Sequence, residues 1–204
     1  MQLIEEEQGS RSGPRPKAGK MDPVTLLEEA VLDLERHAAA AGWDAPPRLY
    51  ALVESAELLR REPALAERFH LSEDENTLVV LEQEALPHSH SIEEALARIA
   101  WPPTVAGCAL VIERIILPPD VEEEMPEDEA AALEWAASHP RHDDVRIVVG
   151  VLRDGERHSV LRVRRHDTDE EVLSGPDLVP ALADQLAATL EPDLPEEPEQ
   201  AERR

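Results

Sequence analysis

The sequence predicts a single α/β domain of mixed α+β character, with a mixed sheet of about five strands, a C-terminal hairpin and about five flanking helices. Three observations favour this fold. Helical and strand patterns alternate in the first half, two long β-branched runs meet at an Asp-Gly turn in the second half, and 204 residues suit one domain. The early alternation predicts parallel crossovers, and the hairpin predicts an antiparallel pair. We expect a globular region at 21–190 between disordered polar tails at 1–20 and 191–204.

The first half is predicted to contain three helical stretches and two strands. In chain order they are a helix from Pro23 to Gly42, a strand at 48–54, a helical stretch from Ser55 that restarts at Pro63, a strand at 77–81 and a helix at 91–100. Asp22 is the expected N-cap of the first helix, with Pro23 as its first residue and Gly42 as its end. Ser91 and Glu94 have the spacing of a capping box.

The second half is predicted to contain a long strand, a helix, a hairpin and a last helix. In chain order they are a strand at 106–117, a helix at about 127–138, a hairpin at 145–166 and a helix that Asp177 caps and that continues to Leu190. Branched aliphatic residues dominate the strand, and carboxylates favour the N-terminal end of the helix at 127–138.

Hydrophobic parity selects the register of the hairpin. A two-residue turn would place Ile147 opposite Arg162, which mixes charge into the apolar face. A three-residue loop of 153–155, with Gly155 in the left-handed conformation, instead places Ile147 opposite Leu161. We therefore predict the three-residue loop.

This register gathers four cationic side chains on one face, and they form the candidate binding site: Arg146, His158, Arg162 and Arg164. Arg146 should face Arg162 directly, and like charges in that position destabilise a sheet unless an anion lies beside them. One interpretation supplies the anion from the protein's own helices. Another supplies it from a small anion or an acidic partner segment bound by the arginines. Catalysis by His158 is a third interpretation.

Composition limits the classes of function. The formal net charge of −25 disfavours nucleic-acid binding, because a phosphate backbone would be repelled. The single cysteine, Cys108, lies in an apolar run and cannot form an internal disulfide, which favours a reducing compartment. No apolar run is long enough to span a membrane, and the N-terminal residues lack the apolar core of a secretory signal. We therefore expect a cytoplasmic protein.

Motifs for metal, cofactor or nucleophilic chemistry are weak. The candidate metal ligands are His88 with His90 in PHSH, His139 with His142 in HPRHDD, and the acidic run 120–129. None has the spacing of a zinc site or a calcium loop. The sequence also lacks GxSxG, GxxxxGK and GxGxxG. We expect no cofactor, no metal site and no catalytic residue.

Three strings carry a resemblance to known sequences: IAWPPTVAGCALVIERIILPP, VRIVVGVLRDGERHSVLRVRRHD and GPDLVPALADQLAATL. From Met21 to Leu190 the chain resembles an uncharacterised family of small acidic cytoplasmic proteins from high-GC actinobacteria. The resemblance implies the same fold and the same compartment. That family brings no reaction, ligand or site residue to this chain.

The sequence therefore favours a non-enzymatic binding or adaptor protein that uses the arginine-bearing face of the 145–166 hairpin. The expected partner is a protein or a small anion, with no membrane and with nucleic acid disfavoured. Two alternatives remain. The histidines and nearby acids could serve a metal-dependent hydrolase, and the strong negative charge could serve an acidic nucleic-acid mimic.

Overall fold

The structure is a computed structural model that describes residues 24–72, 74, 76–84, 86 and 91–191. The predictions of disorder at 1–20 and 191–204 fall outside these residues, apart from Glu191. The predicted cap at Asp22 and the PHSH histidines also fall outside them.

The described chain forms one six-stranded antiparallel sheet, in the order β2-β1-β3-β4-β5-β6. Its strands are β1 (Arg48–Glu54), β2 (Leu78–Glu82), β3 (Gly107–Ile116), β4 (Asp143–Leu152), β5 (Arg157–Val163) and β6 (Leu173–Gly175). Its α-helices are α1 (Leu26–Ala41), α2 (Ser55–Arg61), α3 (Pro63–Arg68), α4 (Ile92–Leu96), α5 (Pro119–Glu122), α6 (Glu129–Ser138) and α7 (Pro180–Ala188). None of these helices is long and apolar enough to cross a membrane.

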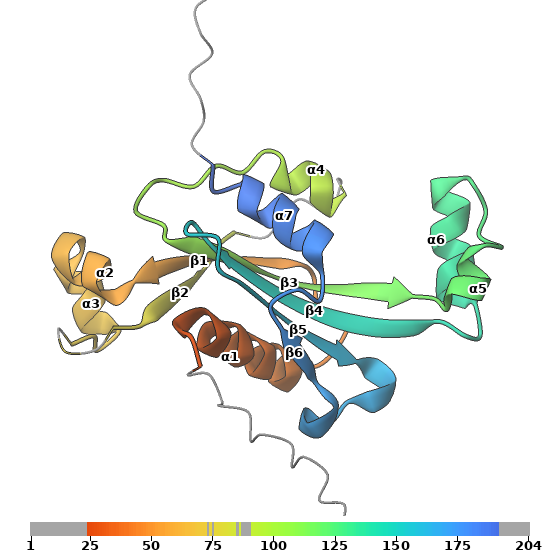
Figure 1. Ribbon diagram of the computed structural model, residues 1–204, viewed down its shortest axis with the longest axis horizontal. Helices are drawn as coiled ribbons and strands as arrows, with labels where there is room; N and C mark the ends of the chain where they lie inside the picture. Colours follow the sequence, from red (N-terminus) through yellow and green to blue (C-terminus); the bar gives the residue numbers. More distant parts are fainter. Residues whose placement is uncertain (1–23, 73, 75, 85, 87–90, 192–204) are drawn as a thin grey trace, which may run out of the picture.

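The predicted fold class, a single mixed α+β domain with a C-terminal hairpin, is confirmed, whereas the predicted early parallel crossovers are wrong. The α2–α3 pair lies beyond one end of the sheet instead of crossing a face of it (Figure 1). The chain therefore returns beside β1 in the opposite direction, and β1 and β2 pair antiparallel. A helical stretch between two strands implies a parallel pair only when it packs along the sheet.

Helices cover both faces of the sheet (Figure 1). The face under α1 has a core of nine buried residues: Leu27, Val31, Leu34, Tyr50, Leu52, Ala109, Val111, Val148 and Val160. The opposite face lies under α4 and α7 and has a larger core, which includes Leu49, Leu110, Val149, Val151 and Leu186. The strands of the sheet centre are therefore apolar on both faces, as β1 shows.

Helix α1 lies unusually close to the sheet at Gly150 of β4. A Cβ atom at this position would lie 2.6 Å from Val31 Cγ2 and 2.9 Å from Leu27 Cδ1. Glycine at position 150 therefore lets the helix approach the sheet. On the same face, the polar residues Arg146, His158 and Arg162 are also buried under the helix.

Several helix ends differ from the sequence prediction. Helix α1 begins at Leu26, where the Thr25 hydroxyl accepts a hydrogen bond from the Glu28 N–H at 3.1 Å. Asp177 does not cap α7, whose N-cap is Val179. Helix α4 ends at Leu96 and not at Ala100, because a turn follows it. The Ser91 cap is confirmed, since its hydroxyl accepts from the Glu94 N–H.

The predicted hairpin register is confirmed. Ile147 pairs with Leu161, and Arg146 pairs with Arg162. Gly155 has φ +95°, as the three-residue loop requires. The parity of apolar residues was therefore sufficient to place every side chain of β4 and β5 on its correct face.

Candidate functional site

Arg146, Arg162 and Arg164 lie at the end of β4 and β5 that is far from the hairpin loop. His158 lies near the loop, opposite Gly150. Helix α1 covers most of the four predicted site residues. The exposed fraction is 1% for Arg146, 3% for Arg162 and 8% for His158. Arg164, just after β5, is the member with an exposed side chain. Of the three interpretations drawn from the sequence, this burial favours the one in which the protein's own helices supply the anion, because α1 packs on the face.

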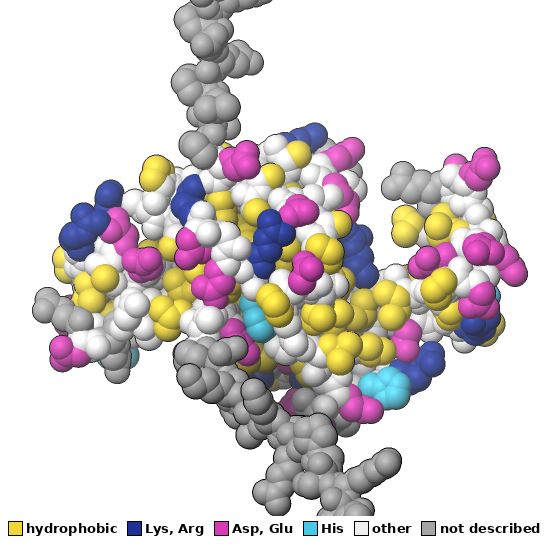
Figure 2. Space-filling view, in the orientation of Figure 1, with side chains coloured by type: hydrophobic (Ala, Val, Ile, Leu, Met, Phe, Trp, Pro, Cys, Tyr) yellow, Lys and Arg dark blue, Asp and Glu magenta, His cyan; other side chains and the backbone are white. Residues whose placement is uncertain are grey.

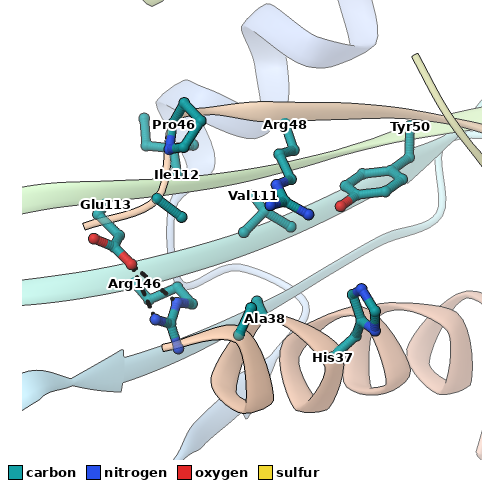
Figure 3. Close-up of a pocket in the computed structure, with 11 residues that line it drawn as sticks. His37, Ala38, Pro46, Arg48, Tyr50, Val111, Ile112, Glu113 and Arg146 are labelled. Carbon is teal, nitrogen blue, oxygen red and sulfur yellow. Dashed lines mark hydrogen bonds and ion pairs between the residues drawn. The ribbon is translucent and has the colours of Figure 1, made fainter. Parts of the chain in front are cut away.

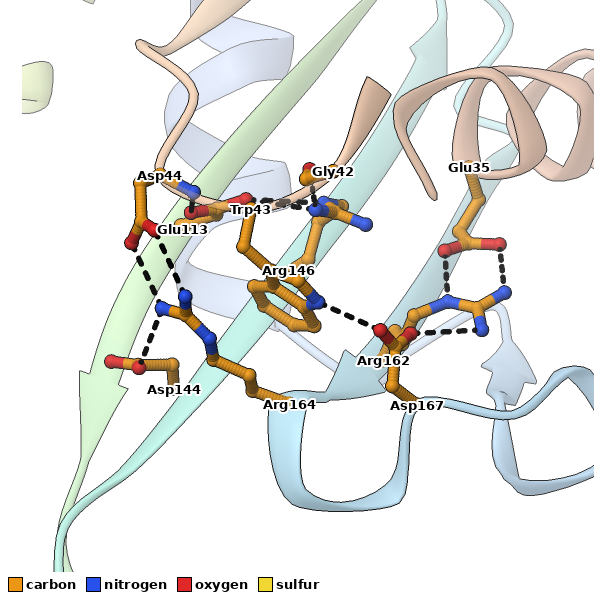
Figure 4. A network of polar contacts seen from close by, with 10 residues as sticks. All are labelled: Glu35, Gly42, Trp43, Asp44, Glu113, Asp144, Arg146, Arg162, Arg164 and Asp167. Carbon is orange, nitrogen blue, oxygen red and sulfur yellow. Dashed lines mark hydrogen bonds and ion pairs between the residues drawn. The ribbon is translucent and has the colours of Figure 1, made fainter. Parts of the chain in front are cut away.

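Arg162 forms a buried, two-pronged ion pair with Glu35 of α1 (Figure 4). Its Nε and Nη2 donate to the two Glu35 carboxylate oxygens at 2.6 and 2.9 Å. Nη2 also donates to Asp169 at 2.7 Å, and Nη1 to Asp167 at 3.3 Å. The hydrogen bonds that Arg162 donates to Glu35 and Asp169 raise its pKa, against the opposing effect of burial. The guanidinium is therefore fully matched by carboxylates of the same chain.

Trp43 separates the other two arginines (Figure 4). The guanidinium carbons of Arg146 and Arg164 lie 4.3 and 5.4 Å from the centroid of its ring, within the range of cation–π attraction. The indole Nε1 donates to Asp167 at 2.9 Å, and this bond holds the pKa of Asp167 below its ordinary value. The ring thus sits between two cations and is oriented by one acid.

Carboxylates of the same chain also neutralise Arg146 and Arg164. Arg146 donates to Glu113 at 3.0 Å and to the Gly42 carbonyl. Arg164 donates to both oxygens of Asp44 at 2.8 and 2.9 Å and to Asp144 at 3.2 Å. These contacts join the end of α1, the α1–β1 link and three strands into one network. The repulsion expected between Arg146 and Arg162 is therefore offset inside the molecule.

His158 is buried on the same face, where its Nε2 lies 2.8 Å from the Ser174 hydroxyl of β6. Burial lowers the pKa of His158 below its ordinary value, and the nearby carboxylates of Glu28 and Glu156 offset part of this effect. The folded protein thus favours the neutral imidazole.

The low pKa of His158 predicts a loss of stability in acid. The unfolded chain takes up the proton near pH 6.5, whereas the folded chain takes it up only at lower pH, so the free energy of unfolding falls as the pH drops below about 6.5. His158→Gln keeps a polar group beside Ser174 and removes this titration. Urea unfolding between about pH 7 and pH 5 should give a flatter profile for the variant. Parallel profiles for the two proteins would contradict the assignment.

A small cavity adjoins Arg146 under the end of α1 (Figure 3). Its volume is about 20 Å³, and His37, Arg48 and Tyr50 line it together with Arg146. Among the described residues, Arg146 Nη1 has no hydrogen-bond partner. The cavity has room for a water molecule and is too small for a substrate.

The candidate metal ligands in HPRHDD and in the acidic run 120–129 contact other groups of the protein. His142 Nδ1 lies 2.6 Å from the His139 carbonyl oxygen, and Asp120 in the acidic run pairs with Arg141. In the part of the chain that the structure describes, no three His, Cys, Asp or Glu side chains are grouped as a metal site would require. Burial raises the pKa of the Cys108 thiol to about 11, so it is not an activated nucleophile.

A groove of about 950 Å³ opens on the α4–α7 face of the sheet, over β1 and β2. Hydrophobic side chains reach the surface in this region, between the α2–α3 pair and α7 (Figure 2). Its apolar lining includes Leu49, Ala51, Val53, Leu58, Leu65, Leu81, Leu86, Ile99, Trp101 and Val105. This volume and lining are typical of binding pockets. Sequence reasoning missed the groove, because its walls come from four separate segments.

Arg153, from the tip of the hairpin, fixes one wall of the groove. Its guanidinium donates to the carbonyl oxygens of Val105 at 2.8 Å, Trp101 at 3.0 Å and Pro102 at 3.1 Å. It also donates to the Leu190 carbonyl in the segment that follows α7. A segment without regular secondary structure is thereby held in one position beside the sheet.

The comparison with protein families identifies the family of this chain. The profile of the PPA1309-like protein family matches residues 27–191, which include every element from α1 to α7. The chain belongs to the PPA1309-like family. No curated protein and no solved structure matches it. The PPA1309-like match includes every residue of the polar network, from Glu35 to Asp169.

Proposed function

We propose that this PPA1309-like protein is a non-enzymatic, cytoplasmic binding or adaptor protein whose groove over β1 and β2 receives an apolar segment of a protein partner. The groove carries the proposal: it has a volume of about 950 Å³, and most of the side chains that line it are apolar. The buried free thiol of Cys108 suits a reducing compartment. Lys17 and Lys20 are the only lysines, and arginine supplies the other positive side chains. This bias and the family resemblance favour an actinobacterial source.

The partner contact is placed at the groove and not at the arginine face for a physical reason. Arg146 and Arg162 already have carboxylate partners beneath α1, so an anionic partner would have to displace them. The groove requires no such exchange, because its lining is mainly apolar. We assign a structural role to the network of Arg146, Arg162 and Arg164 with their carboxylate partners, which is to stabilise the sheet that carries the groove.

Photo-crosslinking tests this proposal. A photoreactive residue at position 65, on the groove wall, should give a discrete protein adduct in cells. The same residue at position 133 is the matched control, since Leu133 is also a helical leucine but is 64% exposed on α6, outside the groove lining. Leu81→Glu should abolish the adduct from position 65 by placing a charge in the groove. Adducts from position 133 alone, or an adduct that Leu81→Glu leaves unchanged, would contradict the proposal.

A further inference from the structure

The outer edge of β2 presents backbone groups for pairing. β2 is the first strand in the sheet order and pairs only with β1 among the described residues. The Ser55 N–H donates to the Thr77 carbonyl, and the Gln83 N–H donates to the Leu49 carbonyl, each at 2.9 Å. These two bonds show that positions 77 and 83 face β1.

Bonded and unbonded positions alternate along an antiparallel ladder. The odd-numbered residues of β2 therefore bond to β1, and the even-numbered residues direct their N–H and C=O groups outward. The outward set is Leu78, Val80 and Glu82. This edge could accept one more strand through main-chain hydrogen bonds.

The groove adjoins this same edge. Leu81 of β2 and Gln83, which follows β2, line the groove, and Ala51 lies opposite Leu81 on its floor. Side chains alternate between the two faces of a sheet, so a strand added to β2 would direct every second side chain toward the groove. The remaining side chains would lie on the α1 face.

The charges around this edge select the partner. On the α1 face, Glu82 is half-exposed and has a long 3.8 Å ion pair with Arg48, and Glu54 is exposed on the adjacent strand. At the groove, Glu57, Glu62 and Glu84 outnumber Arg61 and Arg98, and Arg61 pairs with Glu57. In a chain of net charge −25, this surface attracts cationic segments.

We infer that the partner binds as an extended strand on the edge of β2, with apolar side chains in the groove alternating with lysine or arginine side chains on the α1 face. The inference rests on the proposed function and adds the conformation and charge of the bound segment. Main-chain bonds to Val80 and its outward neighbours give affinity, and the groove selects the alternate apolar side chains.

A synthetic peptide tests the inference. The probe is a peptide of about eight residues with alternating valine and lysine, long enough for one strand, and its control has the same composition with the valines and lysines in separate blocks. The full chain should bind the alternating peptide more tightly. Val80→Pro removes an outward donor at an edge position and should weaken binding about tenfold. Val80→Ala is the matched control for the lost side chain and should bind as the unchanged protein does.

A second measurement covers the case in which Val80→Pro does not fold, as judged by circular dichroism. Two further peptides are N-methylated at alternate backbone amides, one at the odd positions and one at the even positions. In one of the two, the methyl groups block main-chain pairing with β2, and this peptide should lose binding to the unchanged protein. Any of three results would overturn the strand mode. They are equal binding of the alternating and block peptides, no binding of the alternating peptide, and binding that neither Val80→Pro nor N-methylation changes.

A groove variant distinguishes the failure of this inference from the failure of the proposed function. Leu65→Glu combined with Leu81→Glu should weaken the binding of any apolar segment. If this variant reduces binding but Val80→Pro and N-methylation do not, the strand mode is overturned and the groove proposal stands. If none of these changes alters peptide binding and position 65 gives no adduct in cells, both the strand mode and the groove proposal are overturned.

Discussion

Arg162→Met is expected to destabilise the protein by about 3–5 kcal/mol, because it leaves Glu35 as a buried charge without its partner. Both side chains are 3% exposed, so solvent cannot take over the role of the lost guanidinium. Asp167 and Asp169, the other partners of Arg162, are exposed and lose little. The free energy of unfolding in urea measures the effect.

The double variant Glu35→Leu with Arg162→Met is the control for this result. Replacing both members of a buried ion pair with apolar residues is often neutral or stabilising. We therefore expect the double variant to recover most of the stability that Arg162→Met loses. A single variant that unfolds with an unchanged midpoint would show that the pair is not buried in solution, and the covered face would then have to be reconsidered.

Gly107→Ala has the second largest expected effect, a loss of about 2–3 kcal/mol. A methyl group at this position in β3 would overlap the Val151 carbonyl oxygen and the Leu152 side chain of β4. A carbonyl in the middle of a sheet cannot move away without breaking its ladder. Thermal or urea unfolding should report the loss.

Gly175→Ala provides the matched control, because it makes the same change in another strand. Its added methyl group would lie 3.6 Å from Leu178 Cδ2, which is an ordinary van der Waals distance. We expect a change of less than about 0.5 kcal/mol for this variant. Equal losses for the two variants would attribute the effect of Gly107→Ala to strand propensity instead of the close contact.

Local patterns in the sequence were sufficient to predict the register of the hairpin. They were insufficient to predict which elements pack on it. The register follows from the parity of Ile147 and Leu161, which depends only on nearby residues. Whether Arg162 faces water depends on α1, which is more than 100 residues away in the chain. One signal was present, since Glu35 continues the four-residue spacing of Leu27 and Val31 on the buried stripe of α1. An acid in that position indicates a buried cation opposite it.

The sheet topology and the groove were less accessible from the sequence. Pro63 correctly predicted a restart of the helix, but no local feature tells whether α2 and α3 pack along the sheet or beyond its end. The groove likewise depends on how β1, β2, α3 and the segment after α4 assemble. Ala51 lies on its floor, yet an alanine in an apolar strand does not indicate a groove by itself.

Arg153 donates hydrogen bonds to four carbonyl oxygens and so connects distant parts of the chain. The guanidinium connects the hairpin tip to the wall of the groove and to the segment that follows α7, so these three parts are held in fixed positions relative to one another. Lysine at this position could not reproduce that reach, because its ammonium group lacks the planar fork of donors. Sequence changes in an exposed β-turn can therefore alter the width of a groove formed by other segments.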